Sequence, residues 1–297
     1  MEEALNLVIQ NLANQIKDYE PEIQFKALEI GALRLGEEEK FHVILKYFPG
    51  SAVIGFEVDA AVCEEMNATS EAGMTYFPQA LGTKNENKTF YETNAPMCGS
   101  LFKPNEQLLR LYHNFEVAYL KKETTIDTNS LDSFLEKNSM RDMDFIKIDV
   151  QGAEVDIFAG AAKTLKDVTF IVSEAMFIEH YENQPLFGDV CNSLKKHNLM
   201  FHKFLGGMGG RTLKPALINN DPNYASQHIW SDVVFITNIL NIRTLSSSKL
   251  LKLSFFATLY DSFDVTLFAL NHHDAIYDTD FVEIIFGNQF VKIQTDT

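Results

Sequence analysis

The clearest structural pattern in the sequence lies at residues 144–160, Asp144-Phe-Ile-Lys-Ile-Asp149-Val-Gln-Gly152-Ala-Glu154-Val-Asp-Ile-Phe158-Ala-Gly160. A short apolar run of strand length leads into an acidic turn that contains glycine, and apolar residues at helical spacing follow. The stretch therefore predicts a strand, a sharp turn and a helix. In open α/β sheets, ligands bind at the carboxyl ends of strands, so we expect Asp149, Gln151 and Glu154 to face a crevice.

Lys147 stands between two isoleucines of the predicted strand. A buried lysine is rare unless it is paired, so this position calls for a nearby carboxylate. Two interpretations of the carboxylates in this stretch stay open from the local sequence. They take part in a site at the end of the strand, or they cap the following helix and neutralise Lys147.

The length and charge of the chain limit the number of domains and the kinds of partner that it can have. A chain of 297 residues fits one large α/β domain with an appendage. Its formal charge of -16, from 41 acidic and 25 basic residues, repels phosphate backbones and anionic lipid. We therefore expect no nucleic-acid partner, and a cationic ligand suits this charge slightly better than an anionic one.

The cysteines and the first residues bear on the compartment. Cys63, Cys98 and Cys191 are far apart, odd in number and lack the spacing of a zinc site, so they are expected to be reduced thiols. The N-terminus has neither the basic segment nor the apolar run of a secretory signal. No stretch approaches the ~18 apolar residues that cross a bilayer. The expectation is a cytoplasmic protein without a membrane span.

Further strands and helices follow from the apolar pattern. Helical spacing covers residues 4–19, and it returns after residue 240 at positions such as Leu250, Leu253 and Phe256. Residues 78–82 and 206–210 are expected to be loops, 89–92 an edge strand and 94–100 an exposed loop. Apolar or β-branched runs predict strands at 24–30, 52–56, 74–77, 168–174, 200–205 and 233–237, besides the one at 144–149.

Acidic residues end several of these strands. Glu57 follows the second strand, where a nucleotide ribose can be held by its hydroxyls. The GxGxxG pattern is absent, with only Gly31 and Gly36 available, which argues against a dinucleotide such as NAD and leaves room for a nucleoside without phosphates. Glu174 closes the strand at 168–174, and His180 and Tyr181 come soon after it.

Seven phrases in one order carry a family resemblance: Val53-Ile-Gly-Phe-Glu57-Val-Asp59, Gln79-Ala-Leu-Gly82, Pro96-Met-Cys-Gly-Ser-Leu-Phe-Lys-Pro104-Asn, Ser130-Leu-Asp132, Asp144-Phe-Ile-Lys-Ile-Asp149-Val-Gln-Gly-Ala-Glu154, Tyr181-Glu-Asn-Gln-Pro-Leu-Phe187 and Ile229-Trp-Ser-Asp-Val-Val-Phe235. Through them the chain resembles the FkbM family of S-adenosylmethionine-dependent methyltransferases over about residues 25–236. The first loop departs from the resemblance, since Leu28-Glu-Ile-Gly-Ala-Leu-Arg-Leu-Gly36 replaces a richer glycine pattern.

The resemblance implies an α/β fold of the Rossmann-like class I methyltransferase type. That fold has a mostly parallel seven-stranded sheet with helices on both faces, here with an N-terminal helix in residues 1–22. We expect a methyltransferase domain over 1–240 and a C-terminal helical appendage over 241–297. The implied reaction moves a methyl group from S-adenosyl-L-methionine, usually to a hydroxyl oxygen, with a sugar or secondary metabolite as the expected acceptor.

The resemblance also assigns cofactor residues by position. Glu29, Gly31 and Ala32 stand in the first cofactor loop, Glu57 with Val58 is placed at the ribose, and Ala80 with Leu81 flanks the adenine. Asp149 lies where the methyl donor and acceptor meet. A general base must come within hydrogen-bond reach of the acceptor proton, so Asp149, Glu174 and His180 are the catalytic candidates. The expected substrate or support residues are Lys147, Gln151, Glu154, Ser100 and Tyr181.

Several alternatives stay in view. His180 can be a structural histidine and Trp230 a core anchor. Asp149, Glu154 and Glu174 could hold a divalent cation, but the same groups must neutralise Lys147, so no metal site is predicted. A second hypothesis is a weakly active or inactive methyltransferase-like module that acts as a scaffold in glycan or polyketide assembly. Its helical tail at 241–297 would then dock a second copy or a partner, whereas an NAD-dependent oxidoreductase is disfavoured by the missing GxGxxG.

Overall fold

The structure is a computed structural model that describes residues 2–33 and 39–290, so Gly36 of the first loop lies outside the described residues. Contacts divide the chain into two compact units. We call residues 27–35 and 54–237 the sheet unit, and residues 1–26, 36–53 and 238–297 the helical unit. In the described part of the chain, no helix is both long enough and apolar enough to cross a membrane.

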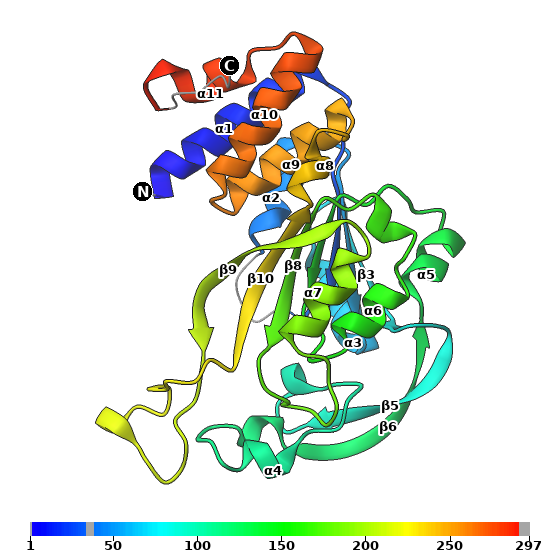
Figure 1. The fold of residues 1–297 in the computed structure, drawn as a ribbon. Coiled ribbons are helices and arrows are strands. Elements are labelled where there is room, and N and C mark those ends of the chain that lie inside the picture. Colours follow the sequence, from blue (N-terminus) through cyan, green and yellow to red (C-terminus); the bar gives the residue numbers. More distant parts are fainter. Residues whose placement is uncertain (1, 34–38, 291–297) are drawn as a thin grey trace. The chain divides into compact units, whose positions relative to one another are not determined.

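A seven-stranded sheet forms the centre of the sheet unit, with the strand order β3-β2-β1-β7-β8-β10-β9 (Figure 1). β7 pairs in parallel with both β1 and β8, whereas β10 runs antiparallel to β8 and β9. This mostly parallel sheet confirms the predicted fold class. The strands are β1 (Lys26–Ile30), β2 (Ala52–Glu57), β3 (Met74–Pro78), β7 (Phe145–Ile148), β8 (Phe170–Met176), β9 (Leu199–Gly209) and β10 (Trp230–Thr237).

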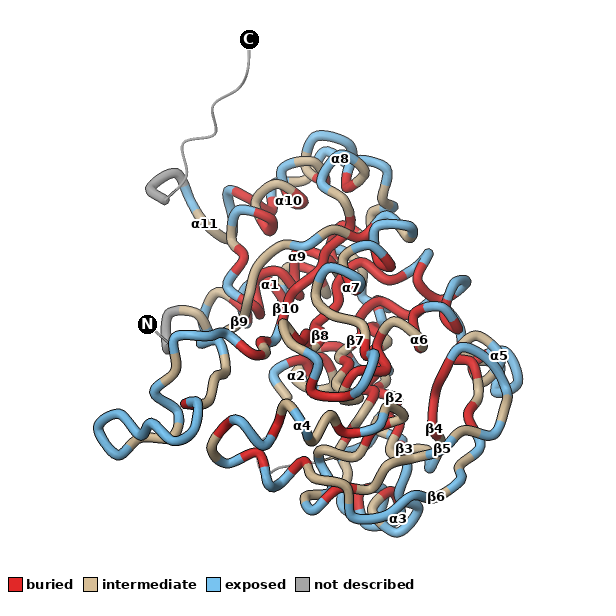
Figure 2. Tube along the Cα trace, turned by 60° about the horizontal axis from the view of Figure 1, so that its bottom comes forward, coloured by how far each residue is buried: buried red, intermediate tan, exposed pale blue. Residues whose placement is uncertain are grey.

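The two faces of the sheet bury different side chains because successive residues of a strand point to opposite faces. Leu28, Ile146 and Ile171 share one apolar cluster with residues of α5 (Leu131–Lys137), α6 (Glu154–Ala159) and α7 (Phe187–Lys195). A second cluster joins Tyr76 of β3 to Cys63 and Met66 of α3 (Ala60–Thr69). Figure 2 shows the buried residues gathered along β7, β8 and β10.

Two boundaries of this sheet differ from the sequence expectation. β8 continues past Glu174 to Met176, because the antiparallel pairing with β10 extends to Trp230 opposite Met176. β9 runs through the predicted loop at 206–210 as far as Gly209, which pairs with Trp230. A Cβ on Gly209 would lie 2.0 Å from the Trp230 ring, so glycine is required for this approach.

A smaller sheet joins β4 (Ala80–Leu81), β5 (Glu86–Thr93) and β6 (Leu120–Asn129), in the order β4-β6-β5. β5 and β6 are antiparallel, and β4 lies parallel to β6. The expected edge strand at 89–92 is therefore longer than predicted, and part of the expected loop at 78–82 is a strand. β6 was missed, because its sequence Leu-Lys-Lys-Glu-Thr-Thr-Ile-Asp-Thr-Asn has little apolar alternation and most of its residues stay partly or fully exposed.

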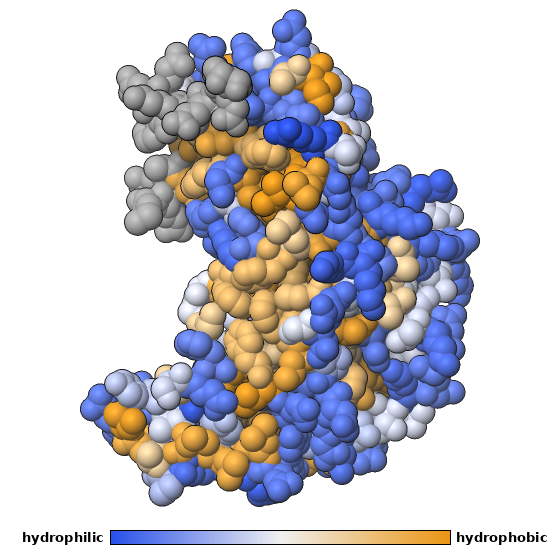
Figure 3. Space-filling view, in the orientation of Figure 1, coloured by the Kyte–Doolittle hydropathy of each residue, from blue (hydrophilic) through white to orange (hydrophobic). Residues whose placement is uncertain are grey.

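The segment between β5 and β6 contains η2 (Pro96–Cys98), α4 (Glu106–Leu109) and η3 (Glu116–Ala118). It was expected to begin as an exposed loop, yet Ser100 is only 1% exposed. The segment between β9 and β10 projects from the sheet and shows apolar surface in Figure 3. Its exposed apolar side chains are Leu213, Leu217, Ile218 and Tyr224.

The helical unit is built around α9 (Ser247–Leu259), whose residues from 253 to 259 are all buried. Ser246 caps this helix by accepting a hydrogen bond from the Lys249 N–H. The aromatic rings of Phe25, Phe48 and Phe255 pack against one another in the same unit. The other helices are α1 (Glu2–Tyr19), η1 (Lys40–His42), α2 (Val43–Tyr47), α8 (Ile239–Ile242), α10 (Phe263–Tyr277) and α11 (Phe281–Phe290). This confirms the N-terminal helix and the helical character of the described part of the tail.

Candidate functional site

Backbone hydrogen bonds join the carboxyl ends of β1, β2 and β7. The N–H groups of Gly31 and Ala32 both donate to the carbonyl oxygen of Phe56 at 3.0 Å, and the Asp149 N–H donates to Ile30 at 2.9 Å. Gly31 has a φ of +81°, and a Cβ there would lie 1.9 Å from the Asp149 carbonyl oxygen. Only glycine allows this approach, so Gly31 holds the first loop against the turn that follows β7.

Glu57 ends β2 beside this junction. One of its carboxylate oxygens, Oε1, accepts hydrogen bonds from the N–H groups of Val58 at 2.7 Å and Asp59 at 3.1 Å. The other oxygen has no hydrogen-bond partner among the described residues, and the side chain is partly exposed. The Glu57 carbonyl accepts from the Gln79 N–H at 3.0 Å, which brings the segment after β3 to the same edge. Glu57 is thus fixed in place with one oxygen available to a ligand.

The predicted adenine neighbours belong to β4. Ala80 and Leu81 are buried and pair with Thr128 and Asn129 of β6. Leu81 also lies in the apolar cluster that contains Phe56 of β2. The structure therefore places an apolar pair next to the segment that carries Glu57.

Glu29 and Lys147 lie side by side on neighbouring strands, below the edge. Their Cα positions are partners in the register of β1 and β7, and both side chains point away from the apolar cluster around Ile146. The Tyr76 hydroxyl donates to Glu29 Oε2 at 3.2 Å. Lys147 Nζ lies 3.8 Å from Asp149 Oδ2, so the half-buried lysine has the carboxylate that the sequence called for.

Glu154 braces the turn after β7. Its Oε1 accepts hydrogen bonds from the N–H groups of Val150 at 3.1 Å and Gly152 at 3.3 Å. The side chain is buried, and burial raises the pKa of Glu154 to about 7, an effect that the turn N–H groups oppose and the charge of Asp149 reinforces. Glu154 therefore stabilises the backbone of the turn after β7.

Gln151 connects two carboxyl groups on neighbouring strands. Its side-chain Nε2 donates to Asp149 Oδ1 at 2.8 Å and to Glu174 Oε2 at 2.7 Å. Burial, and next the negative charge of Asp149, raise the pKa of Glu174 well above its ordinary value. Asp232 lies opposite Glu174 in the antiparallel register of β8 and β10 and adds a third carboxylate. Sequence reasoning had not singled out Asp232, although its place directly before the predicted strand at 233–237 was a usable signal.

Tyr181 and Ser100 hold Gln151 from the other side. The Tyr181 hydroxyl lies 3.0 Å from Gln151 Oε1 and 2.8 Å from the Cys98 carbonyl oxygen. The Ser100 hydroxyl donates to the Gln151 carbonyl oxygen at 2.6 Å. Burial raises the pKa of Tyr181 well above its ordinary value, so the phenol keeps its proton and acts as the donor. The structure thus brings Asp149, Gln151, Glu174, Tyr181 and Ser100 into one network.

His180 faces a different group of side chains. Its ring packs edge-on against Phe115 at 5.0 Å and Trp230 at 5.9 Å between centroids, and the Arg211 guanidinium lies 4.8 Å from the Trp230 ring. Burial, and next the charge of Arg211, lower the pKa of His180 to about 4. Its Nε2 is buried without a hydrogen-bond partner in the described part of the chain. His180 is therefore neutral at pH 7 and oriented toward aromatic rings.

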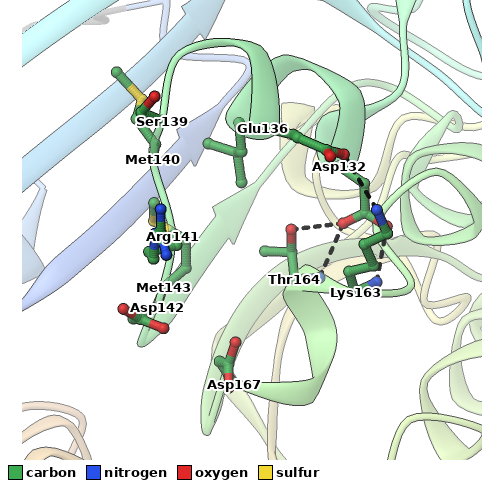
Figure 4. A pocket seen from close by; sticks show the side chains of 11 residues that line it. Asp132, Glu136, Ser139, Met140, Arg141, Asp142, Met143, Lys163, Thr164 and Asp167 are labelled. Carbon is green, nitrogen blue, oxygen red and sulfur yellow. Dashed lines mark hydrogen bonds and ion pairs between the residues drawn. The ribbon is translucent and has the colours of Figure 1, made fainter.

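A pocket of about 380 Å³ lies elsewhere in the sheet unit (Figure 4). Residues 139–143, directly before β7, and Thr164 line it, and Thr164 donates to Asp132 at 2.7 Å. Because it flanks the amino end of β7, this pocket is at the opposite edge from Asp149. Within residues 2–33 and 39–290, no three His, Cys, Asp or Glu side chains are grouped so that they could hold a metal ion.

Comparisons with known proteins identify the family of this chain. The sequence profile described as "Methyltransferase FkbM domain" matches residues 29–200, which contain both the Gly31 loop and the Gln151 network. A relative, "2-O-methyltransferase NoeI" of Sinorhizobium fredii, is 28% identical over 196 residues, covering 63% of this chain and 77% of the relative.

Solved structures give a weaker likeness. A TehB-like SAM-dependent methyltransferase from Corynebacterium glutamicum is 12% identical with a TM-score of 0.34, covering 77% of this chain and 88% of that chain. Magnesium protoporphyrin IX methyltransferase from Synechocystis with bound SAM is 9% identical with a TM-score of 0.35, covering 79% of each chain. Scores this low add nothing to the fold described above. On the profile match across more than half of its length, the chain belongs to the methyltransferase FkbM domain family.

Proposed function

We propose that this protein transfers the methyl group of S-adenosyl-L-methionine to a hydroxyl oxygen of a sugar or a secondary metabolite. The observation that carries the proposal is the junction at Gly31, which packs the first loop against Asp149 while Glu57 stands beside it. Family membership supports methyl transfer as the reaction class. The name of the relative, a 2-O-methyltransferase, supports oxygen as the acceptor atom.

The residues at this edge fit a nucleoside without phosphates. Glu57 offers a carboxylate oxygen to ribose hydroxyls, as an acid at the end of a second strand does in nucleotide-binding βαβ units. Buried Ala80 and Leu81 offer apolar contact to the adenine, while Ala32 is buried and Val58 exposed beside the ribose position. Glu29 lies near the end of β1, the strand that leads into this loop. S-adenosylmethionine supplies an electrophilic methyl group on a sulfonium.

The chain's own residues then have to orient the acceptor and take its proton. A proton acceptor must lie within hydrogen-bond reach of the reacting hydroxyl, and general-base catalysis is commonly worth about 10²–10⁴ in rate. Asp149 and Glu174 are the suitable groups, since His180 has a pKa of about 4 and a buried Nε2. We assign Asp149 to the reacting edge, with Lys147 paired to it and Glu154 holding its turn.

The first test is binding of the methyl donor. Calorimetric titration of the whole chain with S-adenosylmethionine is expected to show one site, and Glu57→Gln is expected to weaken it by about tenfold or more, as for loss of a hydrogen bond to a charged group. Glu64→Gln, which changes an exposed carboxyl on α3, is the matched control. No heat of binding at millimolar ligand would reject the proposal in favour of the scaffold hypothesis.

The second test concerns the transfer. Tritiated methyl groups are followed from S-adenosylmethionine into a panel of monosaccharides, nucleotide sugars and phenols. Asp149→Asn, which keeps the size of the side chain, is expected to retain donor binding and to lose at least about a hundredfold in transfer. Undiminished transfer by this variant would remove Asp149 from the mechanism.

A further inference from the structure

Gln151 has an unusual backbone conformation at the centre of the carboxyl network. Its φ is +55°, in the left-handed region that strains a residue with a side chain. Such strain persists only where surrounding contacts impose it, and it concentrates at functional sites. Ser100 is only 1% exposed, and its hydroxyl donates a hydrogen bond to the Gln151 carbonyl oxygen at 2.6 Å. This conformation allows the Gln151 side chain to turn back toward Asp149.

The hydrogen bonds of the Gln151 amide leave only one orientation of that group. Carboxylates accept hydrogen bonds, so the NH₂ end must face Asp149 and Glu174, at 2.8 and 2.7 Å. The carbonyl end then faces the Tyr181 hydroxyl, which donates to it at 3.0 Å. Tyr181 is 1% exposed and also lies 2.8 Å from the Cys98 carbonyl. A rigid phenol thus fixes the direction of the amide that joins the two carboxyl groups.

The groups that face Asp149 and Glu174 include more acidic side chains than basic ones. Two carboxyl groups that share one site do not both ionise easily, because each disfavours the charged form of the other. The partners of Gln151 are therefore suited to carry one proton between them. The charged and titratable groups that face the pair are Lys147 on β7, Glu154 at the start of α6, Asp232 on β10, Cys98 in η2, and Tyr181.

We propose that Gln151 and Tyr181 are positioning residues that hold Asp149 and Glu174 as a single proton-accepting pair for methyl transfer. This inference rests on the proposed function. In the transfer, the O–H bond of the acceptor breaks and its proton joins a carboxyl oxygen of the pair. The oxygen electron pair forms the bond to the methyl carbon, while the electrons of the sulfur–methyl bond remain on sulfur. The total charge is conserved, since one cation and one carboxylate become two neutral groups.

Two consequences separate this role from ordinary packing. Loss of the Gln151 N–H donors removes hydrogen bonds that favour the charged form, so the pKa of the pair must rise. Loss of the Tyr181 hydroxyl frees the amide to rotate, so the pKa must rise by less. Burial raises the pKa of Glu174 already, and both changes act in the same direction.

The experiment compares two ligands that differ by one charge. S-adenosylmethionine carries a sulfonium, whereas S-adenosylhomocysteine has a neutral sulfur at the same place. Ionisation of the pair favours the cation, so the ratio of the two affinities is expected to increase with pH, and its midpoint reports the pair. Calorimetry between pH 5 and 9 measures this ratio without any methyl acceptor.

Gln151→Leu is expected to move the midpoint upward by about one pH unit or more, and Tyr181→Phe by a smaller amount, with affinity for S-adenosylhomocysteine kept within about twofold. Tyr112→Phe is the matched control. Its buried hydroxyl also donates to a glutamine carbonyl oxygen, that of Gln227 at 2.7 Å, but in the cluster around Phe115. An unchanged midpoint in both test variants overturns the inference, and so does an equal shift in the control.

Failure of the proposed function gives a different result. If the wild type binds neither ligand, the methyltransferase proposal falls, and the pairing is then tested by urea unfolding, which Trp230, the single tryptophan, reports from the sheet unit. Tyr181→Phe is expected to change the unfolding constant at pH 8 about tenfold with Glu174 present and by less than threefold in a Glu174→Gln background. Equal effects in the two backgrounds show that Tyr181 does not act through the pair, which overturns the inference. This second readout also serves if Gln151→Leu does not fold.

Discussion

Glu57 and Glu174 are the same residue type on two strands of one sheet, yet their surroundings differ. Glu57 receives two backbone hydrogen bonds on one oxygen and remains partly exposed. Glu174 is linked to Asp149 through Gln151 and lies opposite Asp232. Backbone N–H groups favour a charged carboxylate, whereas burial and neighbouring carboxylates favour the protonated form. The surroundings of Glu57 are therefore suited to hold ligand hydroxyls, and those of Glu174 to accept a proton.

Topological position alone does not determine the chemical role of an acidic residue in this sheet. Both residues lie toward the carboxyl ends of their strands, where ligands bind in open α/β sheets. Their chemistry differs because of the groups that surround each carboxyl. Gly31 links the two regions, because it packs against Asp149 and donates a hydrogen bond to Phe56.

Gly31→Ala is expected to disturb both the segment at Glu57 and the turn at Asp149. The added Cβ meets the Asp149 carbonyl oxygen at 1.9 Å, and a φ of +81° is strained for alanine, so the turn after β7 must move. We expect a loss of at least about 2 kcal/mol in the free energy of unfolding. Misplacement of the reacting groups by about 1 Å can cost a hundredfold in rate, so methyl transfer should fall by about that factor, and affinity for S-adenosylhomocysteine should fall as well. Urea unfolding, the tritiated-methyl assay and calorimetry measure these effects.

Gly188→Ala is the control for this change. Gly188 lies in α7, where a Cβ would meet no atom within 4 Å, and alanine is a better helix former by about 1 kcal/mol. This variant should keep its affinity and lose no stability. Normal ligand binding by Gly31→Ala would show that the first loop does not depend on its contact with Asp149.

Glu154→Gln is expected to change how the free energy of unfolding depends on pH. The folded pKa of about 7 lies above the ordinary value of 4.5, so the folded chain retains a proton that the unfolded chain releases. Wild-type stability therefore falls as pH rises from about 4.5 to about 7 and then levels off. The difference of about 2.5 pH units corresponds to about 3 kcal/mol, which the glutamine variant does not lose.

Urea unfolding at pH 4.5 and 8, followed through Trp230, measures this effect. The stability of Glu154→Gln relative to the wild type should increase between the two pH values, because only the wild type loses stability on ionisation. The amide oxygen of the variant can still accept from Val150 and Gly152, which keeps the turn in place. Glu64→Gln controls for the loss of one carboxyl at the surface. A pH-independent difference would show that the fold does not raise the pKa of Glu154.

The main sheet could be predicted because its strands are short apolar runs separated by helical spacing. Residues 144–160 form β7, a turn and α6 as expected, and the family resemblance supplied the strand count. β6 could not be predicted in the same way, since a polar strand that is stabilised by backbone pairing with β5 leaves little periodic signal. The end of β8 also depended on a partner strand far along the chain.

The candidate site was predictable only in part. Asp149, Gln151 and Glu154 share one turn, so their proximity follows from local sequence. Their bonds to Glu174, Tyr181 and Ser100 depend on tertiary packing, because these residues lie between 23 and 51 positions away from Gln151. The burial of Ser100 contradicted a polar loop composition, and no periodicity could reveal it. The lowered pKa of His180 arises from aromatic neighbours and Arg211, which the sequence does not place beside it.

His180→Phe is expected to have the smallest effect at neutral pH. Phenylalanine keeps the edge contacts with Phe115 and Trp230 and removes a buried Nε2 that has no partner among the described residues, so stability at pH 7 should stay within about 1 kcal/mol. The folded pKa of about 4 is below the ordinary 6.5, so the wild type loses stability as pH falls through this range, whereas the variant does not. At pH 5 the variant should gain about 2 kcal/mol relative to the wild type in urea unfolding.

Methyl transfer at pH 7 should remain within about threefold of the wild type, because a neutral histidine turned toward aromatic rings takes no acceptor proton. Transfer reduced a hundredfold with donor binding intact would instead make His180 the base and assign the carboxyl pair a structural role.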